Sequence, residues 1–346
     1  MNRRNFRRLT ALVGLAAMAA LAAAGLNAAP AAERETGLVL YAYDSFVSEW
    51  GPAGKVIPRF EARAGAKVTV ISAGDAGQTL SRAILEKADP RADLILGIDN
   101  NLLARALEEN ILEPYLSPQL ALVPAELRFD STHSVTPFDH GWFAVVYDSQ
   151  AVKEPPASLE DLASPRFKSR LILEDPRTSS PGLGFLLWTI AVYRDRWPDY
   201  WRRLAPSVLT VADGWDAAYG MFTAGEAPLV LSYTTSPAYH LENEQTERYR
   251  AAIFREGHYR QIEGVGILKG AKHPALARRF IDFVLTEEFQ QEIPLTNWMY
   301  PVNPNTRLPE SFRLAPRPAI SLALPAAEIK ANQERWLREW ARLLAR

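Results

Sequence analysis

Aromatic and acidic side chains recur in this sequence at the points where predicted strands end. Asp44, Asp75 and Asp99 have such positions. The aromatic residues that follow predicted strands or lie in turns are Tyr43, Trp50, Trp215, Tyr233, Tyr239 and Trp298. Ring stacking and cation–π contacts each contribute about 1 to 2 kcal/mol in a desolvated site. The pattern favours a site for a flat, cationic ligand, although scattered surface aromatics and turn aspartates would produce the same pattern.

A hydroxyl-rich stretch follows the predicted strand at 229–231. Residues 232–236, Ser-Tyr-Thr-Thr-Ser, are expected to supply capping side chains for a helix that has a proline in its first turn. A strand that opens into a helix at the surface presents free backbone N–H groups and a positive dipole end, which bind anions. A second such helix start is predicted at Ser179 or Ser180. The alternative for the 229–240 stretch is a capped helix with two half-buried tyrosines and no ligand.

The common signatures of catalytic sites are missing. There is no phosphate-binding P-loop, no Gly-x-Ser-x-Gly elbow and no His-Glu-x-x-His pair, and the five histidines are scattered. The chain has no cysteine, so it has neither a thiolate nucleophile nor a disulfide framework. Asp175 and Arg177 could be an acid and an anion clamp, but a turn in which Asp175 accepts backbone N–H bonds is the simpler explanation.

Composition and the N-terminus indicate an exported globular protein. The 346 residues are 48% hydrophobic and 23% charged, enough for two lobes with a core each, and the formal net charge of −1 gives no nucleic-acid footprint. Residues 1–31 combine a basic start, an apolar run and small residues, as a cleaved signal peptide does. Within it, Asn2-Arg-Arg-Asn-Phe6 resembles a twin-arginine signal; an ordinary secretory signal with extra arginines is the alternative.

The elements that would position these side chains alternate in type along the first part of the chain. Strands are predicted at 38–41, 67–71 and 93–98, and helices at 56–64, 79–88 and 102–109. This alternation predicts an α/β fold with a mostly parallel sheet flanked by helices. In such sheets, ligands bind beyond the carboxyl ends of the strands. The aromatic and acidic residues lie at those ends.

The pattern changes at 135–142, which predicts a crossing into a second lobe. Further strands are predicted at 143–147, 171–173, 208–211, 229–231 and 264–268, and further helices at 183–193, 216–224 and from 328 to the end. The last strand is interpreted as the return to the first lobe. Lobe 1 is therefore expected to comprise 38–136 plus 263–305, and lobe 2 to comprise 137–262 plus 306–346, with the placement of the C-terminal segment left open.

Several segments, all in one order, carry a resemblance to a known family. They are Tyr-Ala-Tyr-Asp-Ser-Phe at 41–46, Trp-Gly-Pro at 50–52, Gly-Ile-Asp-Asn-Asn-Leu-Leu at 97–103, Asp-Pro-Arg-Thr-Ser-Ser-Pro-Gly-Leu-Gly at 175–184, Ser-Tyr-Thr-Thr-Ser-Pro-Ala-Tyr-His at 232–240, Glu-Gly-His-Tyr at 256–259 and Asn-Trp-Met-Tyr-Pro at 297–301. From about Leu38 to the C-terminus the chain resembles the periplasmic thiamine-binding proteins of bacterial ABC importers.

The resemblance implies a two-lobed class II solute-binding protein, a periplasmic monomer that has no cofactor and delivers thiamine or its phosphates to a membrane permease. It implies aromatic ligand contacts from Tyr43, Trp215, Tyr239 and Trp298. The residues implied to hold the hydroxyl or phosphate end are Ser179, Ser180, Tyr233, Thr234, Thr235 and Ser236. Asp75 and Ala76 would contact the ligand from a turn. The family often has Asp-Gly where this chain has Asp75-Ala76-Gly77, which makes Ala76 the weakest assignment.

Two other functions remain open at this point. Relatives of this fold bind ferric ion through tyrosinates, for which Tyr233 and Tyr239 are the candidates here. Thiaminase I resembles the same fold and degrades thiamine with a cysteine nucleophile, which this chain lacks.

Overall fold

The structure is a computed structural model that describes residues 37–344 of the chain. The described part begins with parallel strands that belong to separate βα units. Strand β1 (Gly37–Ala42) pairs with β2 (Lys67–Ser72) on one side and β3 (Leu94–Asp99) on the other. Helices α1 (Asp44–Val47), α2 (Ala53–Ala64) and α3 (Ala76–Leu85) lie between these strands in the sequence, and α4 (Leu103–Glu108) follows β3. All six residues of β3 are buried, as expected for a strand covered on both faces. The predicted signal peptide lies outside the described residues.

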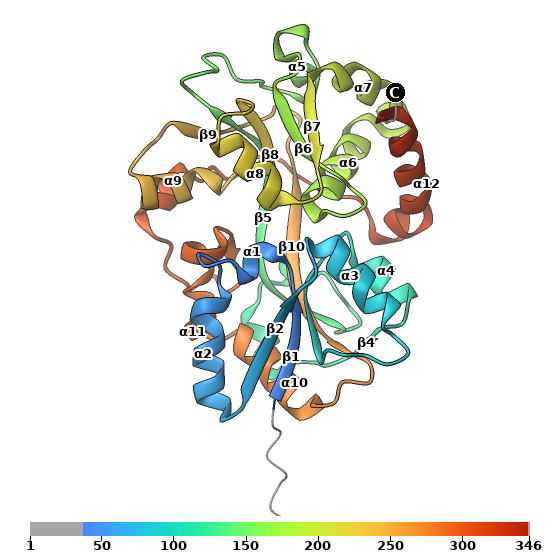
Figure 1. Cartoon of the computed structure of the whole chain (residues 1–346), viewed down its shortest axis with the longest axis vertical. Coiled ribbons are helices and arrows are strands. Elements are labelled where there is room, and N and C mark those ends of the chain that lie inside the picture. The colour runs from blue at the N-terminus through green and yellow to red at the C-terminus, as the bar shows by residue number, and fades with distance from the viewer. Residues whose placement is uncertain (1–36, 345–346) are drawn as a thin grey trace, which may run out of the picture. The chain divides into compact units, whose positions relative to one another are not determined.

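Two long strands connect the two halves of the sheet, whose order is β2-β1-β3-β10-β5-β8-β6-β7 (Figure 1). Strand β5 (Val135–Asp148) pairs antiparallel with β10 (His258–Leu268) along its first part and with β8 (Leu229–Tyr233) along its second. Strand β10 continues the sheet to β3. The crossing predicted at 135–142 is therefore itself a strand, continuous with the predicted strand at 143–147, and all of β5 is buried.

The second half repeats the α/β pattern. Its remaining strands are β6 (Leu171–Glu174), β7 (Val208–Ala212) and β9 (Tyr249–Ala252). Its helices are α5 (Leu159–Leu162), α6 (Ser180–Tyr193), α7 (Trp197–Leu204), α8 (Trp215–Thr223) and α9 (Ser236–Glu244). The first eleven residues of α6 are all buried. Gly184 permits this close packing, since a Cβ there would lie 2.0 Å from the ring of Phe143.

The chain then returns to both halves. Helices α10 (Pro274–Val284) and α11 (Glu287–Gln290) and a π-helical turn (Ile293–Asn297) follow β10. The short strands are β4 (Leu112–Glu113), β11 (Tyr300–Pro301) and β12 (Ser321–Leu322). The 3₁₀ turns are Pro118–Leu122, Ala125–Leu127, Pro165–Phe167, Arg194–Arg196, Ala205–Ser207 and Glu310–Leu314.

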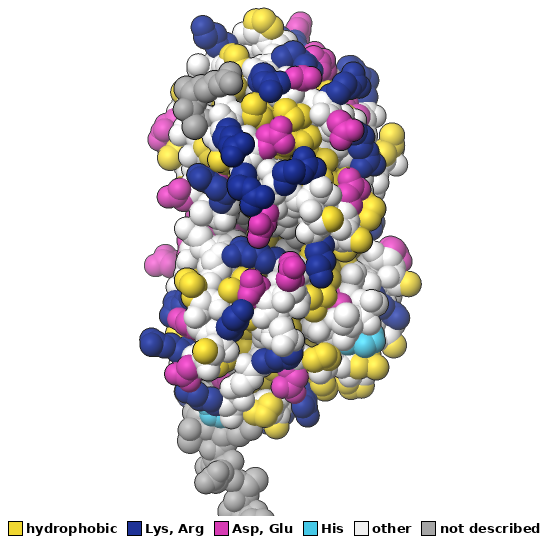
Figure 2. All heavy atoms as spheres, turned by 90° about the vertical axis from the view of Figure 1, so that its right-hand side faces the viewer, with side chains coloured by type: hydrophobic (Ala, Val, Ile, Leu, Met, Phe, Trp, Pro, Cys, Tyr) yellow, Lys and Arg dark blue, Asp and Glu magenta, His cyan; other side chains and the backbone are white. Residues whose placement is uncertain are grey.

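The terminal helix α12 (Ala326–Leu344) contacts both α4 and α7. It buries Ile329, Trp336 and Trp340, which confirms the prediction of a packed helix. Figure 2 shows the face that carries this helix, where Lys and Arg side chains gather among acidic ones. Most of the arginines in the hollow between α7 and α12 form ion pairs; Arg338, for example, pairs with Glu334.

The lobe boundaries stay a prediction, because the described residues lie within one compact unit and β5 and β10 belong to both halves. The predicted helix at 79–88 starts earlier, at Ala76, since Asp75 and Gln78 form a capping box there. No helix in residues 37–344 combines the length and apolarity needed to cross a membrane.

Candidate functional site

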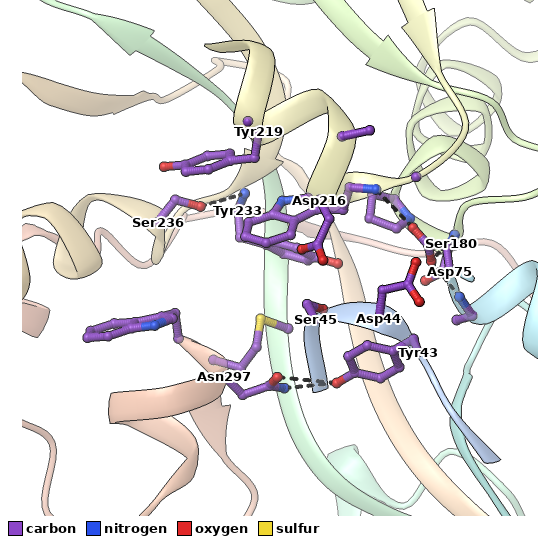
Figure 3. Close-up of a pocket in the computed structure, with 18 of the residues that line it drawn as sticks. Tyr43, Asp44, Ser45, Asp75, Ser180, Asp216, Tyr219, Tyr233, Ser236 and Asn297 are labelled. Atoms are coloured by element: carbon purple, nitrogen blue, oxygen red, sulfur yellow. Dashed lines mark hydrogen bonds between the residues drawn. The ribbon is translucent and has the colours of Figure 1, made fainter. Parts of the chain in front are cut away.

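A cavity of about 610 Å³ lies where the strand ends of the two halves meet, within the size range of small-molecule sites (Figure 3). Its aromatic lining consists of Tyr43, Trp50, Trp215, Tyr219, Tyr233, Tyr239 and Trp298. Its acidic lining consists of Asp44, Asp75, Asp213, Asp216, Glu244 and Glu263. Among the described residues, no lysine, arginine or histidine lines it. The cavity is therefore electrostatically suited to a cation and its rings to a flat one.

Most of the residues predicted for the site come together at this cavity. Nine of them line it: Tyr43, Asp75, Ala76, Ser180, Trp215, Tyr233, Ser236, Tyr239 and Trp298. Three do not. Ser179 caps α6 by accepting from the Gly182 N–H at 3.4 Å, and Thr234 and Thr235 are fully buried behind the wall. Whether any of the twelve contacts a ligand stays a prediction.

The carboxylate of Asp75 joins three helix starts. As the N-cap of α3 it accepts from the Ala76 N–H, and it also accepts from the Trp215 N–H at 3.0 Å and the Ser180 N–H at 3.4 Å. Trp215 and Ser180 are the first residues of α8 and α6 in the other half. Desolvation raises the pKa of Asp75, and these N–H bonds oppose the rise. An anion of the protein therefore occupies the positive ends of α6 and α8.

Stacked rings form one wall of the cavity. Trp215 lies parallel to Tyr219, with centroids 4.8 Å apart at 18°, and meets the exposed Trp50 edge-on at 6.0 Å. The indole N–H of Trp215 donates to the Ser232 hydroxyl at 2.8 Å, which fixes the plane of the ring. Opposite, Tyr239 and Trp298 pack edge-on at 5.3 Å. A flat ligand would find ring faces and edges on two sides.

Polar groups from four segments meet at the cavity floor. The Tyr43 hydroxyl donates to Glu263 Oε2 at 3.2 Å and accepts from the Asn297 amide at 3.1 Å, and this amide also donates to Asp139 Oδ2 at 2.5 Å. Burial raises the pKa of Asp139 to about 7 and that of Glu263 well above its ordinary value, and for Glu263 the Asp139 charge adds to the effect. Gly97, at φ +106°, leaves room for Tyr43, since a Cβ there would lie 2.6 Å from the Tyr43 ring.

The hydroxyl-rich stretch differs from the sequence-based expectation. Thr235 is the N-cap of α9 but makes no side-chain capping bond, because its backbone is already helical. The strand end is not presented to solvent either: four of the residues in 232–236 are buried and Tyr233 is half-buried. Ser236 instead bonds the Ser232 hydroxyl at 2.8 Å. It also accepts the Tyr233 N–H at 3.3 Å (Figure 3).

Several lining residues were not predicted from the sequence, among them Asp216, Tyr219, Glu263 and Asn297. Asp216 and Tyr219 lie in the first turns of α8, where the spacing of four to Trp215 places Tyr219 on the same face, a signal that was available. Burial, with the Asp44 and Asp75 charges, raises the pKa of Asp216 to about 6. Glu263 and Asn297 had no such signal, since only the register of β10 and the π-helical turn bring them to the floor.

The predicted pair of Asp175 and Arg177 has a structural explanation. Asp175 and Arg177 form a turn in which Asp175 accepts the Arg177 N–H at 2.8 Å and pairs with its guanidinium, away from the cavity lining. In residues 37–344, no group of three or more histidine or acidic side chains could hold a metal ion.

The fold and the site together define a two-lobed protein with a ligand cavity at the junction of its halves, the class of extracellular solute-binding proteins. The bacterial extracellular solute-binding protein family matches residues 89–321, and the chain belongs to this family.

The closely similar relatives share one description. The thiamine-binding periplasmic protein of Brucella abortus biovar 1 (strain 9-941) is 43% identical over 318 residues, covering 91% of this chain and 94% of that protein. A solved periplasmic thiamin binding protein is 41% identical with a TM-score of 0.86, covering 90% of this chain and 96% of that one. The ferric ion-binding protein A of Pasteurella haemolytica, at 19% identity and a TM-score of 0.73, covering 89% of this chain and 98% of that one, shares the fold alone.

Proposed function

We propose that this chain captures thiamine in the cavity at the junction of its halves and delivers it to an ABC importer. The observation that carries the proposal is the lining itself, which combines seven aromatic rings with six carboxylates and has no cationic side chain among the described residues. Thiamine is built from two flat rings, one of them a permanently charged thiazolium. Stacking and cation–π contact bind the rings, and the carboxylates offset the charge.

The similarity to thiamine-binding periplasmic proteins supports thiamine as the ligand and the periplasm as the location. Residues 1–31 would then act as a cleaved export signal, by the twin-arginine or the ordinary route. We propose a monomer that works with a membrane permease and binds without catalysis.

Calorimetric titration of the purified chain with thiamine tests the proposal. We expect saturable one-to-one binding, with a dissociation constant that is unaffected by a chelator. Ferric ion is the second titrant, because solved ferric ion-binding proteins share the fold. A coloured ferric complex with no heat from thiamine would overturn the proposal and favour an iron carrier. Formation of cleaved thiamine during the titration would instead indicate an enzyme.

We further propose that thiamine phosphates bind in the same cavity, with the phosphate near Ser180 and Ser236. Both residues lie at the first position of a helix and line the cavity, where the Ser180 hydroxyl donates to Asp99 Oδ2 at 3.0 Å and the Ser236 hydroxyl bonds that of Ser232 at 2.8 Å. Hydroxyls and backbone N–H groups at such positions suit a phosphate. Six lining carboxylates oppose its charge, and Asp75 already bonds the N–H groups of α6 and α8. We therefore expect the esters to bind more weakly than thiamine.

Replacing both Ser180 and Ser236 by alanine is expected to weaken binding of thiamine monophosphate more than binding of thiamine. Each lost charge-assisted bond accounts for about 1.5 to 3 kcal/mol, and thiamine has only a hydroxyl at that end. Titration of both ligands against both proteins measures the difference. Thr235→Ala is the control, since Thr235 is buried behind the wall and should leave the ratio unchanged. Equal losses of affinity for the two ligands would contradict a phosphate subsite at these serines.

A further inference from the structure

The floor of the cavity holds a pair of carboxyl groups that the proposed stacking site does not require. Asp139 lies on β5 and Glu263 on β10, and the two are direct partners in the antiparallel register of these strands. They therefore project from the same face of the sheet, and their side chains are within hydrogen-bonding reach of each other. Glu263 reaches the cavity wall, whereas Asp139 lies wholly beneath it.

Within residues 37–344, no cation compensates this pair. The titratable groups that face it are Tyr43 from the β1–α1 junction, Asp75 at the N-cap of α3, Asp99 from β3 and Tyr233 from β8, all acids. Arg260 and His140 lie at alternate positions of the same strands, and their side chains therefore project from the opposite face. Two charged carboxylates would be unstable in such surroundings.

The hydrogen bonds of the pair are also incomplete. Asn297 donates to Asp139 Oδ2 and Tyr43 donates to Glu263 Oε2, but Asp139 Oδ1 is buried and accepts no hydrogen bond from any described residue. A buried acceptor without a donor is costly, and a proton held between the two carboxyl groups would supply the missing hydrogen bond. The raised pKa values of both groups agree with this arrangement.

We propose that Asp139 and Glu263 share one proton in the ligand-free protein, and that a cation entering the cavity displaces this proton to solvent. The positive charge of the ligand then takes over the role of the proton at Glu263, so the site exchanges one cation for another. A neutral ligand of the same shape would leave the proton in place. Because of this pair, the affinity for cationic ligands should increase with pH. The affinity for neutral ligands should not.

The number of protons released on ligand binding tests the proposed displacement. This test rests on the proposed function only because thiamine is the cation used. Calorimetry at pH 7.0 in two buffers that differ in ionisation enthalpy should show net proton release, between about half and one proton per thiamine. Glu263→Gln, which mimics the protonated acid, should abolish the release. Asp216→Asn and Glu174→Gln should retain it, because Asp216 is already ionised at this pH and Glu174 does not line the cavity. No release from the unaltered protein, or undiminished release from Glu263→Gln, would overturn the proposal.

A second measurement needs no ligand. In the unfolded chain both carboxyls lose their protons near pH 4, whereas the folded pair keeps a proton to about pH 7 or above. The folded state thus binds more protons in this window, and the free energy of unfolding falls as pH rises through it. Thermal unfolding between pH 5 and 8 should therefore show a shallower decline for Glu263→Gln than for the unaltered protein. Parallel curves would exclude the shared proton even if thiamine proved not to be the ligand.

Discussion

Replacing Asp75 by asparagine is expected to weaken thiamine binding by ten- to hundred-fold and also to lower the melting temperature. The carboxylate lines the cavity, where it faces the proposed cation, and it accepts N–H bonds from the first residues of three helices. Asparagine has no negative charge, and its amide NH₂ group is a donor that would face the backbone N–H donors of the helix starts. Hydrogen bonds to a charged group contribute about 1.5 to 3 kcal/mol each, so both binding and folding depend on this side chain.

Asp44→Asn separates the two effects of Asp75. Asp44 also lines the cavity and contributes a negative charge there, but its side chain accepts no backbone N–H from the other half. We expect this control to lose some affinity and to keep its melting temperature, as followed by calorimetry and circular dichroism. If both variants lose affinity equally and neither loses stability, the contacts of Asp75 between helix starts contribute nothing, and only its charge acts.

The second large effect is expected from Trp215→Ala, with a loss of about 1 to 3 kcal/mol in thiamine binding, or roughly 5- to 150-fold. Trp215 provides the ring that stacks on Tyr219 and whose indole N–H is fixed by Ser232. Trp215→Phe keeps a flat ring but not the hydrogen bond, and should recover most of the affinity. Thiamine should quench the intrinsic fluorescence of the unaltered protein, with less quenching in the alanine variant. Full affinity in Trp215→Ala would remove this wall from the binding site.

How far the sequence predicts this structure depends on whether the signal is local. The strand at β1 and the helix at α2 were predicted within a few residues, since apolar periodicity reports burial directly. A capped helix start was predicted at Ser179 or Ser180 for the same reason, because serine followed by proline is a local signal, and the N-cap of α6 is Ser179. The stretch at 232–236 has the same residue types, but tertiary packing buried its hydroxyls instead of exposing them.

The residues at the floor of the cavity could not be predicted from the sequence. Asp139 and Glu263 are far apart in the chain, and only the register of two antiparallel strands makes them partners. Neither residue sits at a strand end, where the search for ligand contacts was directed. Asn297 contacts Asp139 from a π-helical turn, an element for which the sequence offers no reliable pattern.

The position of β10 in the sheet constrains the order in which the chain folds. Strand β3 ends at Asp99, yet the edge that it offers opposite β1 is covered only by β10, which begins at His258. Until that segment is available to pair, the first half of the sheet keeps an unpaired edge on a strand that is apolar except for Asp99, the kind of edge that promotes aggregation. The N-terminal strands must therefore wait for most of the remaining chain. Folding should be late and concerted, and a nascent chain that is truncated before His258 should bind chaperones instead of forming a stable first lobe.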